Sequence, residues 1–241
     1  MKTRKPDFEW GRFFKEVSGP RPRALLLDYD GTLAPFRIER EQAVPHPELH
    51  SALERIVRAG RTRVVVISGR ALRDLIPLLG LEPLPELWGC HGWERRLPDG
   101  RYRGPELEPI ASRALAQARQ WARSAGLNGR CEAKPAGIAI HWRGMDAGSI
   151  ERLRARVRAA WEPFARVPQL ELHEFDGGLE LRASGRNKEY AVASILRELE
   201  DDALVAYAGD DRSDEDAFRA LSGRGLRILV RPEYRKTAAD L

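Results

Sequence analysis

Short apolar runs alternate with stretches of helical periodicity near both ends of the chain. The apolar runs predict strands at 24–27, 63–67, 87–89, 204–208 and 226–230. The spacing of hydrophobic positions predicts helices at 8–17, 47–59, 71–79, 187–199 and 214–220, with Pro77 interrupting the third. Nearly continuous apolar strands separated by helices are typical of a buried parallel sheet. We therefore predict an α/β fold for these two parts of the chain.

The middle of the chain has a different pattern, with long helices and paired short strands. Helices are predicted at 110–125 and 149–165. Strands are predicted at 131–134 and 137–142 around a Pro135-Ala136 turn, and at 170–174 and 179–181 around Asp176-Gly177-Gly178. Two helices and two hairpins form a compact α+β unit. We therefore predict a core domain made of 1–96 and 182–241, and an inserted domain made of 97–181.

The composition is that of a globular protein, since 42% of the 241 residues are hydrophobic and 32% are charged. The formal net charge is +5, but the arginines are spread through the predicted helices among glutamates. Aromatic residues make up only 7%, which is too few for a base-stacking platform. These features argue against nucleic acid as a partner, whereas a mildly cationic surface suits a small anionic molecule.

The sequence has no feature of a membrane or secreted protein. No apolar run approaches the roughly 20 residues that span a bilayer, and residues 1–7 do not lead into the apolar core of a signal peptide. Cys90 and Cys131 have no partners at metal-finger spacing, so we interpret both as reduced thiols. We expect a cytoplasmic protein that is a monomer and does not bind membranes.

Two predicted strands end in acidic residues. The run at 24–27 is followed by Asp28-Tyr29-Asp30-Gly31-Thr32, and the run at 204–208 by Gly209-Asp210-Asp211. Either cluster alone is compatible with an ordinary turn. Because the carboxyl ends of parallel strands meet at one edge of a sheet, Asp28, Asp30 and Asp210 are expected to converge there. Carboxylates that repel one another in a cleft need a cation, and oxygen ligands of this kind suit Mg²⁺.

Polar residues near the predicted helix starts have two interpretations. Ser68, Gly69 and Arg70 follow the second strand, where a hydroxyl and backbone amides either bind phosphate or simply cap a helix. Lys188 lies at a helix start, where the helix dipole disfavours a cation, so an anionic partner is expected unless the lysine is a free surface residue. Three further acids follow the predicted strand at 204–208, namely Asp211, Glu215 and Asp216. For them, the alternative to a place in the metal site is that they cap the next helix or compensate its dipole.

Four segments, in this order, resemble the motifs of the haloacid dehalogenase-like (HAD) phosphatases. They are Asp28-Tyr29-Asp30-Gly31-Thr32-Leu33, Ile67-Ser68-Gly69-Arg70, Asn187-Lys188 and residues 209–218. The last motif, with the segments 131–134 and 140–143, is most similar to the trehalose-6-phosphate phosphatases. The resemblance implies a HAD-like Rossmannoid core with a parallel sheet, and it identifies the inserted α+β domain as a cap that determines substrate specificity.

For the core, the resemblance implies a Mg²⁺-dependent phosphatase that forms an aspartyl phosphate. Asp28 is the implied nucleophile and Asp30 the general acid and base, so two acids are needed at one strand end. Ser68 and Lys188 are implied to hold the phosphoryl oxygens. The implied metal site consists of Asp28, the main-chain carbonyl of Asp30, and Asp210, with Asp214 acting through water and Asp211 as a weaker candidate.

For the cap, the resemblance assigns Glu132, Lys134 and Glu180 to sugar hydroxyls. Together with His141 and Arg143, these three residues stand at alternate positions of the predicted hairpin strands, so several of the five can share one face. The alternative is that they form the polar outer face of an antiparallel sheet.

Three core residues complete the predicted substrate contacts, namely Gly69, Arg70 and His91. For His91, a packed hinge residue is the alternative. Cys90 and Trp93 stand where the corresponding family segment usually has asparagine and alanine, so the shape of the pocket mouth can differ from that of the family.

The most specific function that the resemblance implies is hydrolysis of trehalose 6-phosphate to trehalose and phosphate. One alternative is a phosphatase for another glycosyl phosphate, such as a glycosyl-3-phosphoglycerate or sucrose 6-phosphate. A second alternative is a catalytically silent sensor that binds a sugar phosphate. The presence of Asp28 and Asp30 together with Lys188 argues against the silent sensor.

Overall fold

The computed structural model describes residues 9–175, 177–231 and 235–241, so Phe8 and Asp176 of the predicted elements lie outside the described residues. The chain divides into two compact units. The core unit consists of Met1–Arg103 and Arg186–Leu241, and the inserted unit consists of Gly104–Gly185. The chain therefore leaves the core unit once and returns to it once.

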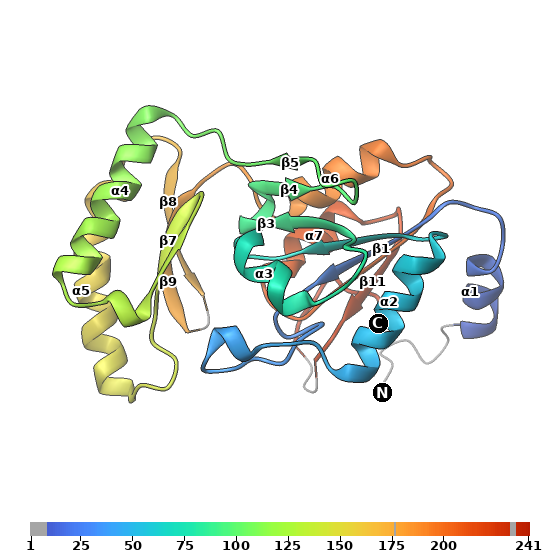
Figure 1. Ribbon diagram of the computed structural model, residues 1–241, viewed down its shortest axis with the longest axis horizontal. Coiled ribbons are helices and arrows are strands. Elements are labelled where there is room, and N and C mark those ends of the chain that lie inside the picture. The colour runs from blue at the N-terminus through green and yellow to red at the C-terminus, as the bar shows by residue number, and fades with distance from the viewer. Residues whose placement is uncertain (1–8, 176, 232–234) are drawn as a thin grey trace. The chain divides into compact units, whose positions relative to one another are not determined.

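The core unit is built on a seven-stranded sheet (Figure 1). Its strands are β1 (Arg23–Asp28), β2 (Arg63–Ile67), β3 (Glu86–Gly89), β4 (Glu94–Arg96), β5 (Tyr102–Arg103), β10 (Leu204–Gly209) and β11 (Leu226–Leu229). The strand order is β11-β10-β1-β2-β3-β4-β5. The first five strands in this order are parallel, whereas β4 and β5 pair antiparallel at one edge. The predicted parallel sheet is therefore confirmed, and the antiparallel edge was not predicted.

Helices cover both faces of the core sheet. The helical elements are α1 (Trp10–Val17), η1 (Arg40–Gln42), α2 (Pro47–Ala59), α3 (Leu72–Leu79), η2 (Cys90–Gly92), α6 (Lys188–Glu198) and α7 (Asp214–Ala220). Neighbouring residues of β1 point to opposite faces, as strand geometry requires. Leu27 packs in one hydrophobic cluster with residues of α2 and α3, and Leu26 packs in another with residues of α6 and α7.

The helix ends follow local sequence signals. α2 begins at Pro47 and is followed by Gly60, whose φ of 64° lies in the left-handed region that glycine tolerates. α3 differs from the prediction because it continues through Pro77 to Leu79. Leu75 and Leu79 lie one turn apart and are fully buried, so the packing of this helix face outweighs the lost backbone hydrogen bond.

The inserted unit is a four-stranded antiparallel sheet with two helices on one face (Figure 1). Its elements are α4 (Pro109–Ser124), η3 (Asn128–Arg130), β6 (Cys131–Lys134), β7 (Gly137–His141), α5 (Ala147–Ala165), β8 (Leu170–Phe175) and β9 (Gly178–Ala183). The strand order is β6-β7-β9-β8. Ile138, Ile140 and Leu181 pack in one hydrophobic cluster with residues of α4 and α5 such as Trp161. The predicted pair of helices and pair of hairpins are confirmed, and polar side chains remain on the other sheet face.

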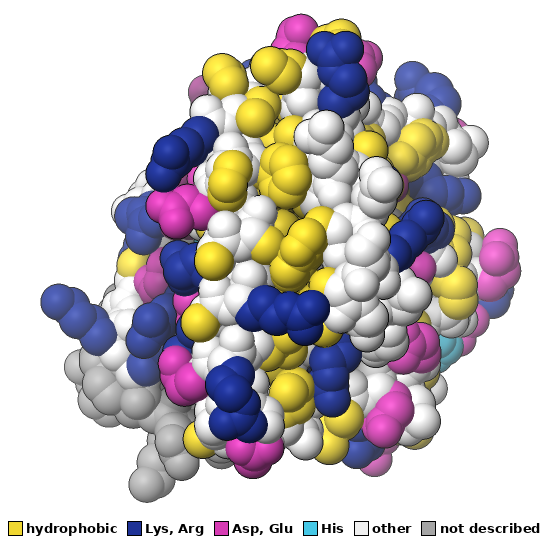
Figure 2. Space-filling model, turned by 90° about the vertical axis from the view of Figure 1, so that its left-hand side faces the viewer, with side chains coloured by type: hydrophobic (Ala, Val, Ile, Leu, Met, Phe, Trp, Pro, Cys, Tyr) yellow, Lys and Arg dark blue, Asp and Glu magenta, His cyan; other side chains and the backbone are white. Residues whose placement is uncertain are grey.

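Charged side chains of both signs are dispersed over one face of the molecule (Figure 2). On the face shown in Figure 2, Lys and Arg side chains lie among Asp, Glu and hydrophobic side chains and do not merge into one block. Some of these charges pair within a helix, as Arg58 does with Glu54 at 2.9 Å. Across the described ranges, no helix has both the length and the apolar character needed to cross a bilayer.

Glu94 joins the antiparallel edge to α3. Its buried carboxylate accepts hydrogen bonds from the Tyr102 hydroxyl at 2.7 Å, the Leu72 backbone N–H at 3.0 Å and the Cys90 thiol at 3.1 Å. Glu94 therefore caps α3, whose own N-cap residue makes no side-chain hydrogen bond.

Cys90 and Cys131 are both free cysteines, as predicted. The strands β4 and β5 were missed because they are short and rich in arginine, without apolar alternation.

We expect Glu94→Ala to lower the free energy of unfolding by about 1–3 kcal/mol, because the substitution leaves the N–H of Leu72 and the hydroxyl of Tyr102 without their acceptor. Glu94→Gln keeps one acceptor oxygen and is expected to cost less. Urea unfolding followed by circular dichroism measures both variants. Equal stability of Glu94→Ala and the unchanged protein would contradict this role.

Candidate active site

The carboxyl ends of two neighbouring strands bring three carboxylates together. Asp28 is the last residue of β1, and Asp210 directly follows β10, which pairs with β1 in parallel. Asp214 is the first residue of α7. Each of the three side chains is buried and offers an oxygen within 4.8 Å of the others. Asp28 and Asp210 thus converge as the strand pattern predicted, whereas Asp30 lies outside this group.

Lys188 provides the positive charge beside these acids. From the first position of α6, its Nζ donates to Oδ1 of Asp28 and to Oδ1 of Asp214, each at 2.6 Å. Burial lowers the pKa of Lys188, but the two carboxylates more than offset this effect and raise the pKa overall. The Asn187 side chain caps the helix by accepting the N–H of Tyr190 at 3.0 Å. Lys188 is therefore a buried partner of two acids rather than a free surface lysine.

Asp214 organises the site through four hydrogen bonds. Besides Lys188, its Oδ1 accepts the Tyr207 hydroxyl at 2.5 Å. Its Oδ2 accepts the backbone N–H groups of Asp210 at 3.0 Å and Asp211 at 2.9 Å. The role of Tyr207 was missed, although a tyrosine in an otherwise aliphatic strand is a signal that its hydroxyl needs a buried partner. Asp214 therefore fixes the loop after β10 and holds Lys188 in place.

Burial raises the pKa of two of the clustered carboxyl groups. For Asp28 the rise is opposed by Lys188 and increased by the negative charges of Asp214 and Asp210. Burial, followed by repulsion from Asp214, raises the pKa of Asp210 to about 7. Among the described residues, Oδ1 of Asp210 is a buried oxygen with no hydrogen-bond partner. A hard divalent cation is bound by clustered carboxylate oxygens, and it can use an oxygen that has no hydrogen-bond partner. These residues therefore fit Mg²⁺.

The glycine and threonine after Asp30 have separate physical roles. Gly31 has a φ of 88°, and a Cβ at this position would overlap the Asp210 carboxylate. The Thr32 hydroxyl donates to Oδ2 of Asp28 at 3.3 Å. Gly31 is thus required for the close approach of the two strand ends, and Thr32 orients Asp28.

The side chain of Asp30 points to Arg70. The Nε of Arg70 donates to Oδ2 of Asp30 at 2.8 Å and the second guanidinium nitrogen to Oδ1 at 2.6 Å, which is a two-point ion pair. Arg70 also donates to the Arg40 carbonyl at 3.0 Å and lies over the Tyr29 ring. Arg70, which was predicted to contact the substrate, therefore holds Asp30 in one orientation. Asp30 is the residue predicted to act as both general acid and general base.

Ser68 and His91 lie in adjoining loops at the end of β2 and β3. The buried Ser68 hydroxyl accepts the backbone N–H of Arg70 at 3.1 Å. Ser68 does not cap α3, because that helix begins at Leu72. His91 has a left-handed φ of 56°, and a Cβ at Gly69 would overlap its ring. The lack of a side chain at Gly69 therefore lets His91 pack against the loop that carries Ser68.

The other predicted residues of the core unit have different partners. The Asp211 carboxylate accepts the backbone N–H of Arg212 at 2.6 Å and lies outside the group of three acids. Glu215 forms an ion pair with Arg235 at 2.5 Å, so it binds the C-terminal segment instead of capping α7. Asp216 accepts the side-chain amide of Asn187 at 3.2 Å.

The inserted unit has a polar cluster on the sheet face opposite its helices. In the strand register, Glu132 and Glu180 flank Ala139 from either side, so both lie on one face. Lys134 donates to Glu180 at 2.7 Å and lies 3.8 Å from Glu132, while Nε2 of His141 lies 2.9 Å from Glu132. The shared face predicted for these four residues is therefore present in the structure.

Arg143 differs from the other predicted residues of the inserted unit. It lies two residues beyond the end of β7, and its side chain packs over Gly177. It is therefore in the loop rather than in the row of strand residues that includes His141.

The solved structures that are similar to this chain include two that define its fold. One is the C-terminal domain of a trehalose-6-phosphate phosphatase of Candida albicans, with a TM-score of 0.77 and 19% identity over 95% of this chain and 90% of that chain. The other is a haloacid dehalogenase-like hydrolase from B. subtilis, with a TM-score of 0.55 and 17% identity over 85% of this chain and 88% of that chain. The protein therefore has the fold of the haloacid dehalogenase-like hydrolases.

The sequence relatives define the family more narrowly. A model of the trehalose-phosphatase family matches residues 26–239. A trehalose-phosphate phosphatase of Mycobacterium ulcerans (strain Agy99) is 32% identical over 227 residues, which cover 88% of this chain and 54% of that protein. A bifunctional trehalose-6-phosphate synthase/phosphatase of Thermoproteus tenax is 31% identical over 87% of this chain and 29% of that protein. The chain belongs to the trehalose-phosphatase family, and it spans about half the length of the mycobacterial relative.

We expect Mg²⁺ binding to weaken about tenfold between pH 8 and pH 6, because Asp210, whose pKa is about 7 in the metal-free protein, must be ionised to bind a cation. Isothermal titration calorimetry at each pH measures the dissociation constant. Asp99→Asn, which changes an exposed acid paired with Arg101, serves as the control and should keep the pH dependence of the unchanged protein. An affinity for Mg²⁺ that is constant over this range would contradict the expected role of Asp210.

Proposed function

We propose that the protein is a Mg²⁺-dependent phosphatase that hydrolyses trehalose 6-phosphate to trehalose and phosphate. Family membership supports the reaction class. The observation that carries the proposal is the arrangement around Asp28, which is bound by Lys188, contacted by Thr32 and adjacent to Asp210. A buried carboxylate held by one cation is the arrangement that a nucleophile for phosphorus requires.

Asp28 attacks the phosphorus atom, and an aspartyl phosphate forms as the sugar oxygen leaves. Lys188 opposes the rise in pKa that burial imposes on the Asp28 carboxyl group, and it therefore favours the ionised form. Lys188 and Ser68 then bind the oxygens of the transferred phosphoryl group. Because phosphoryl transfer depends mostly on positioning and on neutralising charge, these fixed partners contribute much of the catalysis.

Asp30 donates a proton to the leaving sugar oxygen and later takes one from the water that cleaves the aspartyl phosphate. The two-point ion pair with Arg70 fixes the orientation of the Asp30 side chain. A protonated Asp30 cannot accept both bonds, so the pair has to open when Asp30 acts as the acid. Arg70 is therefore a positioning residue for Asp30.

Asp28, Asp210 and the main-chain carbonyl of Asp30 are the residues proposed to hold Mg²⁺, with Asp214 supporting the site through water. When bound, the cation neutralises the charge of the phosphoryl oxygens. Asp214 is the less direct ligand because both of its oxygens already accept hydrogen bonds from the protein. Asp210 is the more direct ligand because its Oδ1 has no hydrogen-bond partner among the described residues.

We propose that the inserted unit is the cap and that its polar cluster binds the sugar. Lys134, Glu132 and Glu180 are buried and hold one another through charged contacts. Such fixed donors and acceptors suit hydroxyl groups, and they reject a substrate that leaves them unpaired. We expect His141 to help orient Glu132, and His91 and Gly69 to contact the substrate from the core unit.

A panel of phosphate esters tests the proposal. Phosphate release is measured with trehalose 6-phosphate, sucrose 6-phosphate, a glycosyl-3-phosphoglycerate and glucose 6-phosphate. We expect kcat/KM to be at least about 100-fold higher for trehalose 6-phosphate than for glucose 6-phosphate, because the second sugar ring satisfies additional polar groups of the cap. Equal values for the two would overturn the substrate assignment and leave the phosphatase assignment in place.

Asp28→Asn is expected to reduce phosphate release at least about a thousandfold, because the amide is a poor nucleophile. The matched control is Asp211→Asn, which changes a neighbouring acid outside the cluster and should retain most activity. Sugar-phosphate binding without turnover by the unmutated protein in Mg²⁺ would favour the silent sensor instead.

Glu180→Gln tests the cap separately from the phosphate chemistry. We expect kcat/KM for trehalose 6-phosphate to fall about tenfold or more, because Lys134 loses its charged partner and is no longer held in place. Hydrolysis of p-nitrophenyl phosphate, which has no sugar, should be unchanged. Glu171→Gln, on the same sheet face but paired with Arg182, is the control. An equal loss of kcat/KM with both substrates would mean that Glu180 stabilises the protein and does not bind the sugar.

A further inference from the structure

A pocket lies within the core unit, between α6 and the antiparallel edge of the sheet. Its volume is about 220 Å³. Arginines and aromatic residues dominate its lining, which includes Trp93, Arg95, Arg103, Arg186, Tyr190 and Arg197. In the proposed reaction, none of these side chains has a role. The pocket therefore needs a separate explanation.

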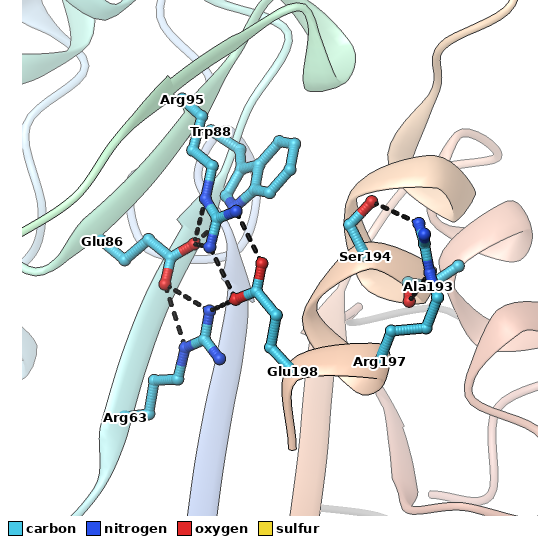
Figure 3. Close-up of polar contacts among 8 residues, drawn as sticks. All are labelled: Arg63, Glu86, Trp88, Arg95, Ala193, Ser194, Arg197 and Glu198. Carbon is cyan, nitrogen blue, oxygen red and sulfur yellow. Dashed lines mark hydrogen bonds and ion pairs between the residues drawn. The ribbon is translucent and has the colours of Figure 1, made fainter. Parts of the chain in front are cut away.

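Two lining residues, Arg95 and Glu198, belong to a network of ion pairs that also includes Arg63 and Glu86 behind the lining (Figure 3). Glu198 accepts bonds from Arg95 and Arg63, and Glu86 accepts bonds from the same two arginines and from Trp88. Hydrogen bonds from Arg95 and Arg63 lower the pKa of Glu198 to about 2. The acid that lines the pocket is therefore ionised and already neutralised by its arginine partners.

The other three arginines of the lining have no carboxylate partner among the described residues. Arg186 lies over the rings of Trp93 at 4.6 Å and Tyr190 at 4.9 Å. Arg197 donates to two uncharged groups, the hydroxyl of Ser194 at 3.0 Å and the carbonyl of Ala193 at 3.2 Å (Figure 3). Arg103 is the third of these lining arginines. The lining thus contains four arginines and one glutamate, an excess of three positive charges.

We propose that this pocket binds the dianion of a small phosphate monoester or of free phosphate, at a site distinct from the candidate active site. Guanidinium groups match phosphate oxygens through paired N–H donors, and three of them approach the pocket from different segments of the chain. The stacking on Trp93 and Tyr190 holds Arg186 in place before a ligand binds, which reduces the entropy lost on binding. The small volume favours a compact anion.

Calorimetric titration of the full chain with inorganic phosphate and with glucose 6-phosphate tests this site. The titration is done at pH 7.5 in a chelator, so that binding at the acidic cluster, which needs a cation, is suppressed. We expect one ligand to bind per chain, with glucose showing no binding. Arg186→Gln and Arg197→Gln should each weaken phosphate binding about tenfold or more, which corresponds to the loss of one charged partner. Arg55→Gln, an exposed arginine on α2, is the control and should bind as the unchanged protein does.

Retained turnover of the preferred sugar phosphate by both variants, with an unchanged circular dichroism spectrum, shows that the fold and the active site are intact. Phosphate binding that is unaffected by both substitutions, or no binding by the unchanged protein at millimolar phosphate, would overturn the inference. These outcomes are independent of the proposed reaction, because the binding assay requires neither Mg²⁺ nor catalysis.

Discussion

The candidate active site depends on one buried ammonium group placed between two carboxylates. Lys188 lies 2.6 Å from both Asp28 and Asp214, and all three side chains are almost completely buried. Removing one member of a buried pair leaves an uncompensated charge, which typically costs about 3–5 kcal/mol. The lysine therefore stabilises the fold at the same time as it prepares Asp28 for chemistry. Stability and function cannot be separated at this position.

The rest of the core unit can be understood from the requirement that these three side chains meet. Asp28 and Asp214 come from segments far apart in the sequence, and the parallel pairing of β1 with β10 brings the loop between β10 and α7 to the end of β1. Gly31 permits the close approach, because a side chain there would overlap Asp210. Tyr207 then completes the set of donors to Asp214 from within β10. The sheet, the glycine and the tyrosine thus serve one electrostatic arrangement.

The sequence predicted the parts of this arrangement that follow from periodicity, and it missed those that depend on side-chain direction. The strand ends at Asp28 and Asp210 could be predicted because parallel strands share an edge. The pairing of Asp30 with Arg70 could not, since spacing along the chain does not show which way two side chains turn. The β4 and β5 hairpin was missed for a related reason. Its residues are held by pairing and by Glu94, not by an apolar pattern of their own.

The helix α6 carries groups of two different kinds at its two ends. Its first residue is Lys188, and its last turn contains Arg197 and Glu198, which line the arginine-rich pocket. With 11 residues, the helix is about 16 Å long, and its backbone hydrogen bonds connect the two ends without a break. A tilt of the whole of α6 would therefore displace the ammonium group of Lys188 as well as the pocket residues. The same helix thus carries the ammonium group that binds Asp28 at one end and charges of the arginine-rich pocket at the other.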